Sequence, residues 1–311
     1  MNMEKQNKSP VVTVVLCTFN GEKFLPEQLS SLASQTRRPD RLVLRDDGSS
    51  DASVAIVEKW AHAEGIALQQ IMGPRLGPAH NFLVALQAAS LADVYLFCDQ
   101  DDVWREDKIE RALQNVPWDQ KSGPVLCATR LAVVDENLEP IRLSFLPKHL
   151  AFDSAVYESL LTGCTMAFNA KFRDTLIRMI PPAMVMHDWW CYLVATGVAG
   201  VTLRFDTEPL VLYRQHSNNA MGAKLTGLAD MHVRLSRFFG TDSALRSRQL
   251  MEFAALYEVV LSPAAANLLH TLLGAKSSLL RRIWAVYKLP VQRQTFLATL
   301  TTRLAVLTNR F

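Results

Sequence analysis

The sequence is poor in the features that mark membrane-spanning, secreted and zinc-binding proteins. It contains no uninterrupted apolar run of about 18 residues that could cross a bilayer. Its polar N-terminal segment lacks the apolar core of a secretory signal. The five cysteines include no CxxC pair and the seven histidines no HxxxH spacing, so neither a disulfide framework nor a zinc site is indicated. We therefore expect a cytoplasmic protein with reduced, buried cysteines.

Acidic residues are absent from the C-terminal part of the chain. The 311 residues are 49% hydrophobic and 20% charged, which excludes a disordered chain and allows a sizeable core. The whole chain is formally +3, yet no Asp or Glu follows Glu258, and the part up to that residue carries a net charge of −4. This asymmetry indicates an acidic partner for the C-terminal region. Its seven basic residues are Lys276, Arg281, Arg282, Lys288, Arg293, Arg303 and Arg310.

Strand and helix patterns alternate in the first half of the chain. Alternation of this kind predicts an α/β fold with a mostly parallel sheet flanked by helices. The expected strands are Val11–Thr18, Arg41–Asp46, Leu68–Met72, Val94–Cys98 and Leu126–Val134. The expected helices are Glu22–Gln35, Ala52–Glu64 and Ala79–Ser90.

The pattern is less regular after Pro140 and becomes helical from about Ala229. We expect helices at Ser154–Leu161 and Lys171–Ile180, and short strands at Thr165–Asn169, Val201–Phe205 and Pro209–Arg214. Breaks in the final helical region are expected at Gly240, Pro263 and Pro290. The predicted organisation is a flexible N-terminus (1–9), a catalytic domain (10–225) and a helical, basic C-terminal region (226–311).

Several common nucleotide-binding and hydrolytic motifs are missing. The sequence has no GxGxxG after its first strand and no GxxxxGK[ST], which argues against a Rossmann dehydrogenase and a P-loop NTPase. It also has no GxSxG elbow, which argues against a serine hydrolase of that type.

Polar clusters follow three of the predicted strands. They are Thr18-Phe19-Asn20, Asp46-Asp47-Gly48-Ser49 and Asp99-Gln100-Asp101-Asp102. Ligands of open α/β sheets bind outside the carboxyl ends of the strands, so we expect these clusters to converge on one site. Ordinary turn chemistry would explain any one of them, but explains all three together less well.

The acidic cluster suggests a divalent metal. Crowded carboxylates repel one another unless a cation or strong donors offset them. Oxygen ligands suit Mg²⁺ or Mn²⁺, and the spacing of Asp99 and Asp101 fits a metal held between protein and diphosphate. The alternative is helix capping, which we assign to Asp107 and also consider for Asp102.

Two later clusters have both a functional and a structural interpretation. Asp188, within His187-Asp188-Trp189-Trp190, suits a general base held dry beside aromatic rings, and suits a helix cap equally well. Arg214 and His216 lie in a polar segment after the last predicted strand, where they could reach a phosphate or metal. Plain surface polarity is the alternative for that segment.

Taken in order, these segments resemble the family 2 glycosyltransferases, which have the GT-A fold. The resemblance covers roughly residues 10–220 through VVLCTFNGEKFLPEQLSSLASQT, LVLRDDGSSD, YLFCDQDDVWREDKI, LLTGCTMAFN, HDWW and YRQHSNN. The DQDDVW, TGCT, HD and YRQH spellings are most similar to the rhamnosyltransferase-type branch, which builds bacterial surface polysaccharide. The QxxRW motif of processive synthases is absent, so one sugar or a few would be added per acceptor.

The resemblance implies a role for each matching residue. Asp101 would be the direct metal ligand, Asp99 would lie nearer the ribose as part of the same DxD motif, and His216 would approach the metal or diphosphate. Asp188 falls at the position of the inverting catalytic base, preceded by His187 where many relatives have Glu. The residues expected to contact the nucleotide-sugar are Thr18, Phe19, Asn20, Glu22, Asp47 (at the pyrimidine base), Asp99, Gly163, Cys164, Thr165 and Arg214.

The expected function is inverting, metal-dependent glycosyl transfer, with dTDP-L-rhamnose as the donor and a glycan or lipid-linked saccharide as the acceptor. The alternatives are transfer from a UDP-hexose, a glycoside hydrolase with two carboxylates, and a non-catalytic nucleotide-sugar-binding scaffold. The segment Ser277–Lys288 resembles a basic amphipathic helix on an anionic membrane. Packing on the catalytic domain and an oligomer contact are the alternatives for it, and nucleic-acid binding is not expected. The predicted location is the cytoplasm, peripheral to the inner face of the plasma membrane.

Overall fold

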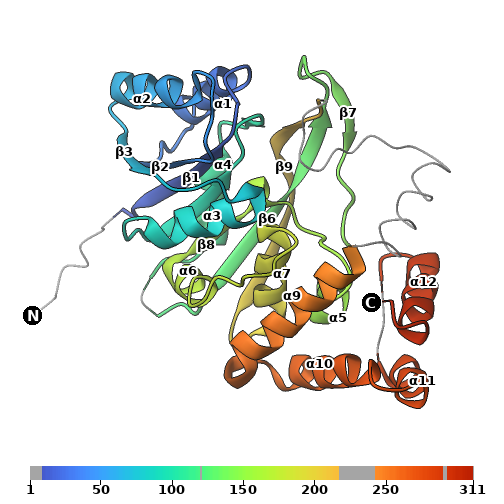
Figure 1. Cartoon of the computed structure of the whole chain (residues 1–311). Coiled ribbons are helices and arrows are strands. Elements are labelled where there is room, and N and C mark those ends of the chain that lie inside the picture. Colours follow the sequence, from blue (N-terminus) through green and yellow to red (C-terminus); the bar gives the residue numbers. More distant parts are fainter. Residues whose placement is uncertain (1–8, 120, 217–241, 290–292, 311) are drawn as a thin grey trace, which may run out of the picture.

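A computed structural model describes residues 9–119, 121–216, 242–289 and 293–310 (Figure 1). The predicted boundary at residues 225–226 and the predicted breaks at Gly240 and Pro290 lie outside these residues. No helix in the described ranges has the length and apolar character needed to cross a membrane.

One mixed sheet forms the centre of the molecule. Its first four strands, in the order β3-β2-β1-β4, are parallel, as expected. The order then continues β8-β6-β9-β5, with antiparallel pairing at β4–β8, β8–β6 and β9–β5 and parallel pairing at β6–β9; β7 pairs with β6. The strands are β1 (Val12–Thr18), β2 (Arg41–Asp46), β3 (Ala67–Ile71), β4 (Val94–Cys98), β5 (Val103–Trp104), β6 (Val125–Val134), β7 (Pro140–Leu143), β8 (Ala167–Asn169) and β9 (Thr202–Arg214).

Helices cover both faces of this sheet. Alternate residues of β1 point to opposite faces, and every residue of the strand is buried. Val14 and Leu16 pack with α1, α2 and α4, whereas Val15 and Cys17 pack with α3, α6 and α7. The helices are α1 (Leu25–Ala33), α2 (Ser53–Glu64), α3 (Gly77–Ala88), α4 (Lys108–Asn115), α5 (Phe152–Ala155), α6 (Ala170–Leu176) and α7 (His187–Gly197).

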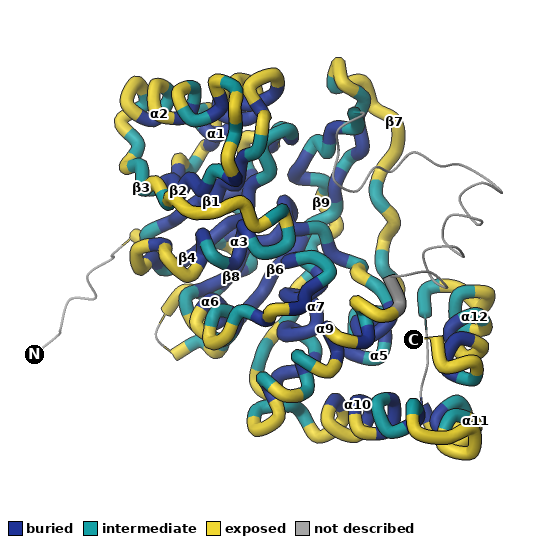
Figure 2. The backbone as a smooth tube through the Cα atoms, viewed as in Figure 1, coloured by how far each residue is buried: buried dark blue, intermediate teal, exposed yellow. Residues whose placement is uncertain are grey.

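The C-terminal helices extend the core on the face covered by α7. Phe253 and Tyr257 of α9 pack against Trp190 of α7, and α10 adds Leu268 and Leu272 to the same buried cluster. Beyond them, α11 and α12 stand at one end of the molecule with many exposed positions (Figure 2). The bounds are α9 (Asp242–Tyr257), α10 (Pro263–Ala275), α11 (Leu279–Lys288) and α12 (Phe296–Leu307).

Three local predictions differ from the structure. The expected helix Ser154–Leu161 is only the short α5, because the Ala155 carbonyl accepts the Trp189 indole N–H at 2.6 Å instead of continuing a helix. The two strands expected between Val201 and Arg214 are one, β9, which stays paired with β6 through a register shift opposite Thr129 and Arg130. The strand expected at Thr165–Asn169 starts later, as β8, after a 3₁₀ turn at Gly163–Thr165.

All five cysteines are free and buried, as expected.

Candidate active site

The polar clusters at the ends of β1, β2 and β4 meet at one edge of the sheet. Thr18 lies opposite Asp46 in the parallel register, and its Oγ1 donates to Asp46 Oδ1 at 2.7 Å. From the end of β4, the Gln100 amide accepts the Phe19 N–H at 2.8 Å and donates to the Phe19 carbonyl at 3.1 Å. The predicted convergence of the three strand ends is therefore confirmed.

The loop after β1 is tied to the loop after β2. Asn20 has a left-handed backbone (φ 48°), and its Oδ1 accepts the Ser50 N–H at 2.8 Å. Glu22 Oε2 accepts the Ala52 N–H at 3.0 Å, which joins the loop to the start of α2. The Phe19 ring is covered by the Arg75 guanidinium, 3.9 Å from the ring centroid. These contacts fix the walls of the predicted nucleotide pocket, and the contacts of Thr18, Phe19, Asn20 and Glu22 with a ligand stay a prediction.

Asp47 is buried and already has several hydrogen-bond donors. Its carboxylate accepts the Leu76 and Gly77 backbone amides at 2.7 Å each, at the start of α3. Arg45, also buried, donates to it from Nη1 at 3.2 Å. Asp47 therefore holds the start of α3 against the end of β2, and its predicted contact with a pyrimidine base stays a prediction.

Asp101 and His216 lie together although 115 residues separate them. His216 Nε2 is 2.8 Å from Asp101 Oδ2, and the His216 ring stacks on Phe24 at 4.6 Å. The pair comes together because β9 ends beside the acidic loop that follows β4. This is the juxtaposition that the family resemblance implies.

Arg214 is 1% exposed and holds the loop that contains Asp101 in place. Its Nε donates to the Asp101 carbonyl at 2.9 Å, and its guanidinium pairs with Glu27 and lies 4.9 Å from the Phe24 ring centroid. Arg214 thus holds the backbone that carries Asp101. Its predicted contact with a phosphate stays a prediction.

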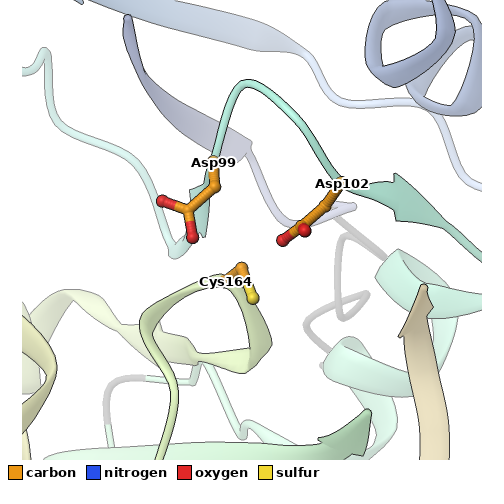
Figure 3. A group of neighbouring side chains, drawn as sticks. All are labelled: Asp99, Asp102 and Cys164. Carbon is orange, nitrogen blue, oxygen red and sulfur yellow. The ribbon is translucent and has the colours of Figure 1, made fainter. Parts of the chain in front are cut away.

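Asp99, Asp102 and Cys164 point toward one another from two loops (Figure 3). One ligand atom from each lies within 4.8 Å of the others. Asp102 is fully buried; its Oδ1 accepts the Arg214 N–H at 3.2 Å, while its Oδ2 has no N–H or O–H partner. Burial raises the pKa of Asp102 although a hydrogen bond with the Cys164 thiol opposes the shift, so this carboxyl favours a proton or a cation beside it.

The capping interpretation is wrong for Asp102 and is confirmed for Asp107 by position only. Helix α4 begins at Lys108, so Asp102 lies too early in the chain to cap it, and β5 intervenes. Asp107 occupies the cap position, but its side chain makes no capping hydrogen bond. Its carboxylate pairs with Arg105 instead, at 2.9 Å, because that guanidinium offers two N–H donors.

Asp188 is the second residue of α7 and lies close enough to Asp99 for its charge to act on that carboxyl. Its Oδ1 accepts its neighbour's amide, that of Trp189, at 2.6 Å. Burial raises the pKa of Asp188 to about 6, although hydrogen bonds from backbone amides oppose the shift. Burial, and then the charges of Asp101 and Asp188, raise the pKa of Asp99 to about 7. Asp188 therefore interacts electrostatically with the acidic loop, and its role as a base stays a prediction.

His187 and Gly163 pack closely behind Asp188. His187 is buried and stacks on Phe82 at 4.2 Å, and burial lowers its pKa to about 3, so the ring is neutral. A Cβ added to Gly163 would lie 2.2 Å from His187 Nε2, which leaves room only for glycine. Thr165 is buried next to this turn and donates to the Thr162 carbonyl at 2.7 Å.

Sequence reasoning missed Lys108 and Phe24, and it included Gln100 only as a member of the acidic cluster, with no role of its own. Lys108 is 2% exposed, its Nζ donates to the Cys164 carbonyl at 2.6 Å, and burial lowers its pKa to about 8. The positive charge of Lys108 therefore acts on the Asp99 carboxylate from within the core. A lysine on the buried side of the first helical turn after the acidic loop could have indicated it, whereas Phe24 and Gln100 resemble ordinary core and turn residues.

The donors of the site fit a hard divalent cation. His216 Nε2 and Asp101 Oδ2 lie 2.8 Å apart, and Asp99 and Asp102 bring carboxylate oxygens within 4.8 Å of each other. Carboxylate and imidazole donors suit Mn²⁺ or Mg²⁺. Burial raises the pKa of the Cys164 thiol well above its usual value, so sulfur is protonated and a poor ligand. Burial, and then the charges of Asp101 and Asp99, raise the pKa of Asp102 well above its usual value, so its carboxyl favours a proton when no cation is bound.

Comparison with known proteins decides the family. The family model described as glycosyl transferase family 2 matches residues 13–178, more than half of the chain. The chain belongs to glycosyl transferase family 2. Among curated proteins of this kind, the dTDP-rhamnosyl transferase RfbG of Shigella flexneri is 26% identical over 227 residues, which cover 68% of this chain and 75% of RfbG. The chain is thus a rhamnosyltransferase-like member of the family.

Solved glycosyltransferase structures share its fold. Staphylococcus aureus TarS in complex with UDP-GlcNAc aligns with a TM-score of 0.57 at 16% identity, over 95% of this chain and 81% of that one. The mannosyltransferase PcManGT of Pyrobaculum calidifontis, in complex with GDP-Man and Mn²⁺, aligns with a TM-score of 0.51 at 21% identity, over 97% and 81%. At this identity the likeness shows the fold alone, and the GT-A prediction is confirmed.

Proposed function

We propose that this family 2 member is an inverting, metal-dependent glycosyltransferase. It would transfer L-rhamnose from dTDP-rhamnose to a glycan or lipid-linked saccharide in the synthesis of bacterial surface polysaccharide. The single observation that carries the proposal is the meeting of three separate segments: the loop with Asp99 and Asp101, His216 paired with Asp101, and Asp188, whose charge acts on Asp99. A glycoside hydrolase would need two carboxylates but neither the Asp101–His216 pair nor a nucleotide pocket.

Asp188 supplies the base. With a pKa of about 6 it is ionised at neutral pH and basic enough to accept the proton of an acceptor hydroxyl. The hydroxyl oxygen then attacks the anomeric carbon on the face opposite the nucleotide, and the bond to the diphosphate oxygen breaks. One displacement inverts the configuration of that carbon.

The acidic loop and His216 act on the leaving group. Asp101 and Asp99 would hold Mg²⁺ or Mn²⁺, which when bound supplies positive charge to the departing diphosphate. His216 is held against Asp101 by its stack on Phe24, and Arg214 fixes the loop backbone beneath them. The chain's own residues therefore preorganise the charge of the site before substrate binds.

The choice of donor and acceptor has narrower support. Rhamnose is proposed because RfbG, which covers two thirds of this chain, is named a dTDP-rhamnosyl transferase. A UDP-hexose donor is the alternative within the same fold. The acceptor we propose is a glycan or lipid-linked saccharide presented at the inner face of the plasma membrane, with the basic C-terminal helices as the contact to that surface.

A thermal-shift screen tests the proposal. The wild type is incubated with dTDP-rhamnose, UDP-glucose, UDP-galactose and GDP-mannose, each with and without Mn²⁺. A ligand that binds only the folded state stabilises it by about 2.7 kcal/mol at a hundredfold excess over Kd. Asp101→Asn should lose the Mn²⁺-dependent shift, whereas the matched control Asp107→Asn, whose carboxylate pairs with Arg105 outside the site, should keep it.

Each outcome has a definite meaning. A metal-dependent shift with dTDP-rhamnose, lost in Asp101→Asn, supports the proposal, and NMR of the product's anomeric proton then tests inversion. A shift with a UDP-hexose instead corrects the donor. No shift with any nucleotide-sugar in a folded protein contradicts both transfer and the nucleotide-sugar-binding scaffold. Donor binding without turnover contradicts transfer and favours the scaffold.

A further inference from the structure

Helices α11 and α12 present large apolar side chains outward. We call these nine residues the C-terminal apolar face; each is between 50% and 84% exposed. Figure 2 shows the two helices together at one end of the molecule, with exposed positions along both. The nine residues are Leu279, Leu280, Ile283, Trp284 and Tyr287 on α11, and Phe296, Leu297, Leu300 and Leu304 on α12.

The arrangement is the reverse of an ordinary surface helix. On α11 the exposed apolar residues are spaced i, i+1, i+4, i+5 and i+8, which places them on one side of a 3.6-residue helix. Ala285 and Leu289 lie on the opposite side and are buried against the protein. The exposed positions of α2 are instead small or polar, for example Glu58 and Lys59. Both sides of α11 are therefore apolar, and only one of them has a partner within the described residues.

Positive charge flanks this face. Arg281 and Lys288 on α11 and Arg303 on α12 are exposed. The sequence contains no acidic residue after Glu258, so no carboxylate of these helices offsets them. Trp284 and Tyr287 add aromatic rings with polar tips, which favour a membrane–water interface.

The two helices are fastened to the catalytic domain. Arg293, between α11 and α12, pairs with Glu158 and donates from Nη1 to Thr302 at 3.1 Å. Gln294 accepts the Lys148 N–H and donates to the His149 carbonyl, both at 2.8 Å. A surface that binds these helices would therefore also set the orientation of the active site.

We propose that the C-terminal apolar face docks on an anionic phospholipid bilayer, with α11 and α12 lying in the interface. The inference rests on the proposed function, because it places the enzyme where a lipid-linked acceptor is presented. Apolar side chains would enter the headgroup–acyl boundary while the flanking Arg and Lys residues meet lipid phosphates. The net charge of −4 on the chain up to Glu258 favours this end of the molecule over the others as the one that faces the membrane.

A second copy of the chain fits this face less well. A two-fold dimer would bring the same patch of each subunit together. The exposed Arg281, Lys288 and Arg303 of one copy would then approach those of the other, with no acidic residue of α11 or α12 between them. An anionic membrane provides both the apolar volume and the opposite charge.

Vesicle co-sedimentation of the full chain tests the inference. Wild type should bind vesicles of phosphatidylcholine with about 30% phosphatidylglycerol. It should bind pure phosphatidylcholine roughly a hundredfold more weakly at low salt, because each of three exposed basic residues contributes about fivefold. An apolar-face variant should lose roughly tenfold or more in affinity, since three exposed anchors are removed. That variant is Leu280→Ser, Trp284→Ser and Phe296→Ser; the matched control changes three comparably exposed apolar residues elsewhere, Leu91→Ser, Ile141→Ser and Val259→Ser, and should bind like wild type.

A charge variant separates the two contributions. Replacing Arg281, Lys288 and Arg303 with glutamine should abolish the preference for anionic vesicles. Each lost charge should lower the affinity for these vesicles about fivefold at low salt. It should leave weak binding to neutral vesicles in place. High salt should reproduce the same loss in the wild type.

Three results would overturn the inference. The first is that folded wild type does not bind anionic vesicles at low salt. The second is that the control variant loses as much vesicle affinity as the apolar-face variant. The third is that light scattering shows a dimer of the wild type that the apolar-face substitutions dissociate. The nucleotide-sugar thermal shift, measured on the same variants, should be unchanged throughout. Absence of that shift in the wild type would contradict the proposed function while leaving vesicle binding a separate result.

Discussion

Asp188→Asn should stabilise the protein at neutral pH and abolish glycosyl transfer, with a gain in stability that grows with pH. In the folded protein, burial raises the pKa of this carboxyl from 3.8 to about 6. Ionised Asp188 therefore disfavours the folded state above pH 6, whereas asparagine is neutral at every pH. The shift of about two units corresponds to about 3 kcal/mol.

The sign follows from proton binding. Between pH 4 and pH 6 the folded state holds a proton on Asp188 that the unfolded chain has lost, so wild-type stability falls as pH rises through this window. The free energy of unfolding of Asp188→Asn should exceed that of wild type by about 1 kcal/mol at pH 4.5 and by about 3 kcal/mol at pH 7.5. Urea unfolding at the two pH values measures the difference, and product formation measures the lost activity.

Asp46→Asn provides a control of opposite sign. Burial of Asp46 is outweighed by hydrogen bonds from Ser49, Thr18 and Gly48, so its pKa is lowered. Its charged form stabilises the fold above pH 4, and the asparagine variant should lose stability relative to wild type as pH rises. A stability difference for Asp188→Asn that is flat or shrinks between pH 4.5 and pH 7.5 would refute the reasoning.

Three further results are expected. Gly163→Ala should lower the free energy of unfolding in urea by about 1–3 kcal/mol, because the new Cβ lies 2.2 Å from the buried His187 ring. Adding His187→Ala to the same chain should recover part of the loss, and an unchanged urea midpoint for Gly163→Ala would contradict the contact. Lys108→Met should lower the free energy of unfolding by about 2 kcal/mol, because the hydrogen bond to the Cys164 carbonyl is lost. Urea unfolding measures the change, and an unchanged stability would argue against a buried ammonium at this position. Calorimetric Mn²⁺ affinity should fall by up to about tenfold per pH unit below pH 7, because the cation must displace a proton from Asp99, and a pH-independent affinity would exclude Asp99 as a ligand.

The convergence of the strand ends was predictable because it depends on local pattern and one topological rule. A mostly apolar, β-branched β1 with a polar residue at its end specifies a buried parallel strand, and parallel strands share an edge at their carboxyl ends. Thr18, Asp46 and Gln100 therefore meet without any long-range information.

Other parts of the site depend on pairing between distant segments. The antiparallel β8 enters beside β4 and carries the Gly163–Thr165 turn to Asp99, which no local pattern in LLTGCTMAFN indicates. Asp102 resembles a cap in the sequence because α4 follows soon after it. Its burial becomes visible only once β9 places the Arg214 amide against it.

Asp188 and Asp99 have different pKa values, which suit them to different roles in the proposed mechanism. Burial raises the pKa of both carboxyls. Asp99 also faces the charges of Asp101 and Asp188, so its pKa is about 7, whereas that of Asp188 is about 6. At neutral pH Asp188 is then mostly ionised and able to take a proton, whereas Asp99 still exchanges its proton and has the most to gain from a cation. Divalent metal binding would ionise Asp99 fully and, by adding positive charge, lower the pKa of Asp188 as well. Because Asp188 acts on the pKa of Asp99, a metal that neutralised the acidic loop would also set how basic Asp188 is under the proposed mechanism.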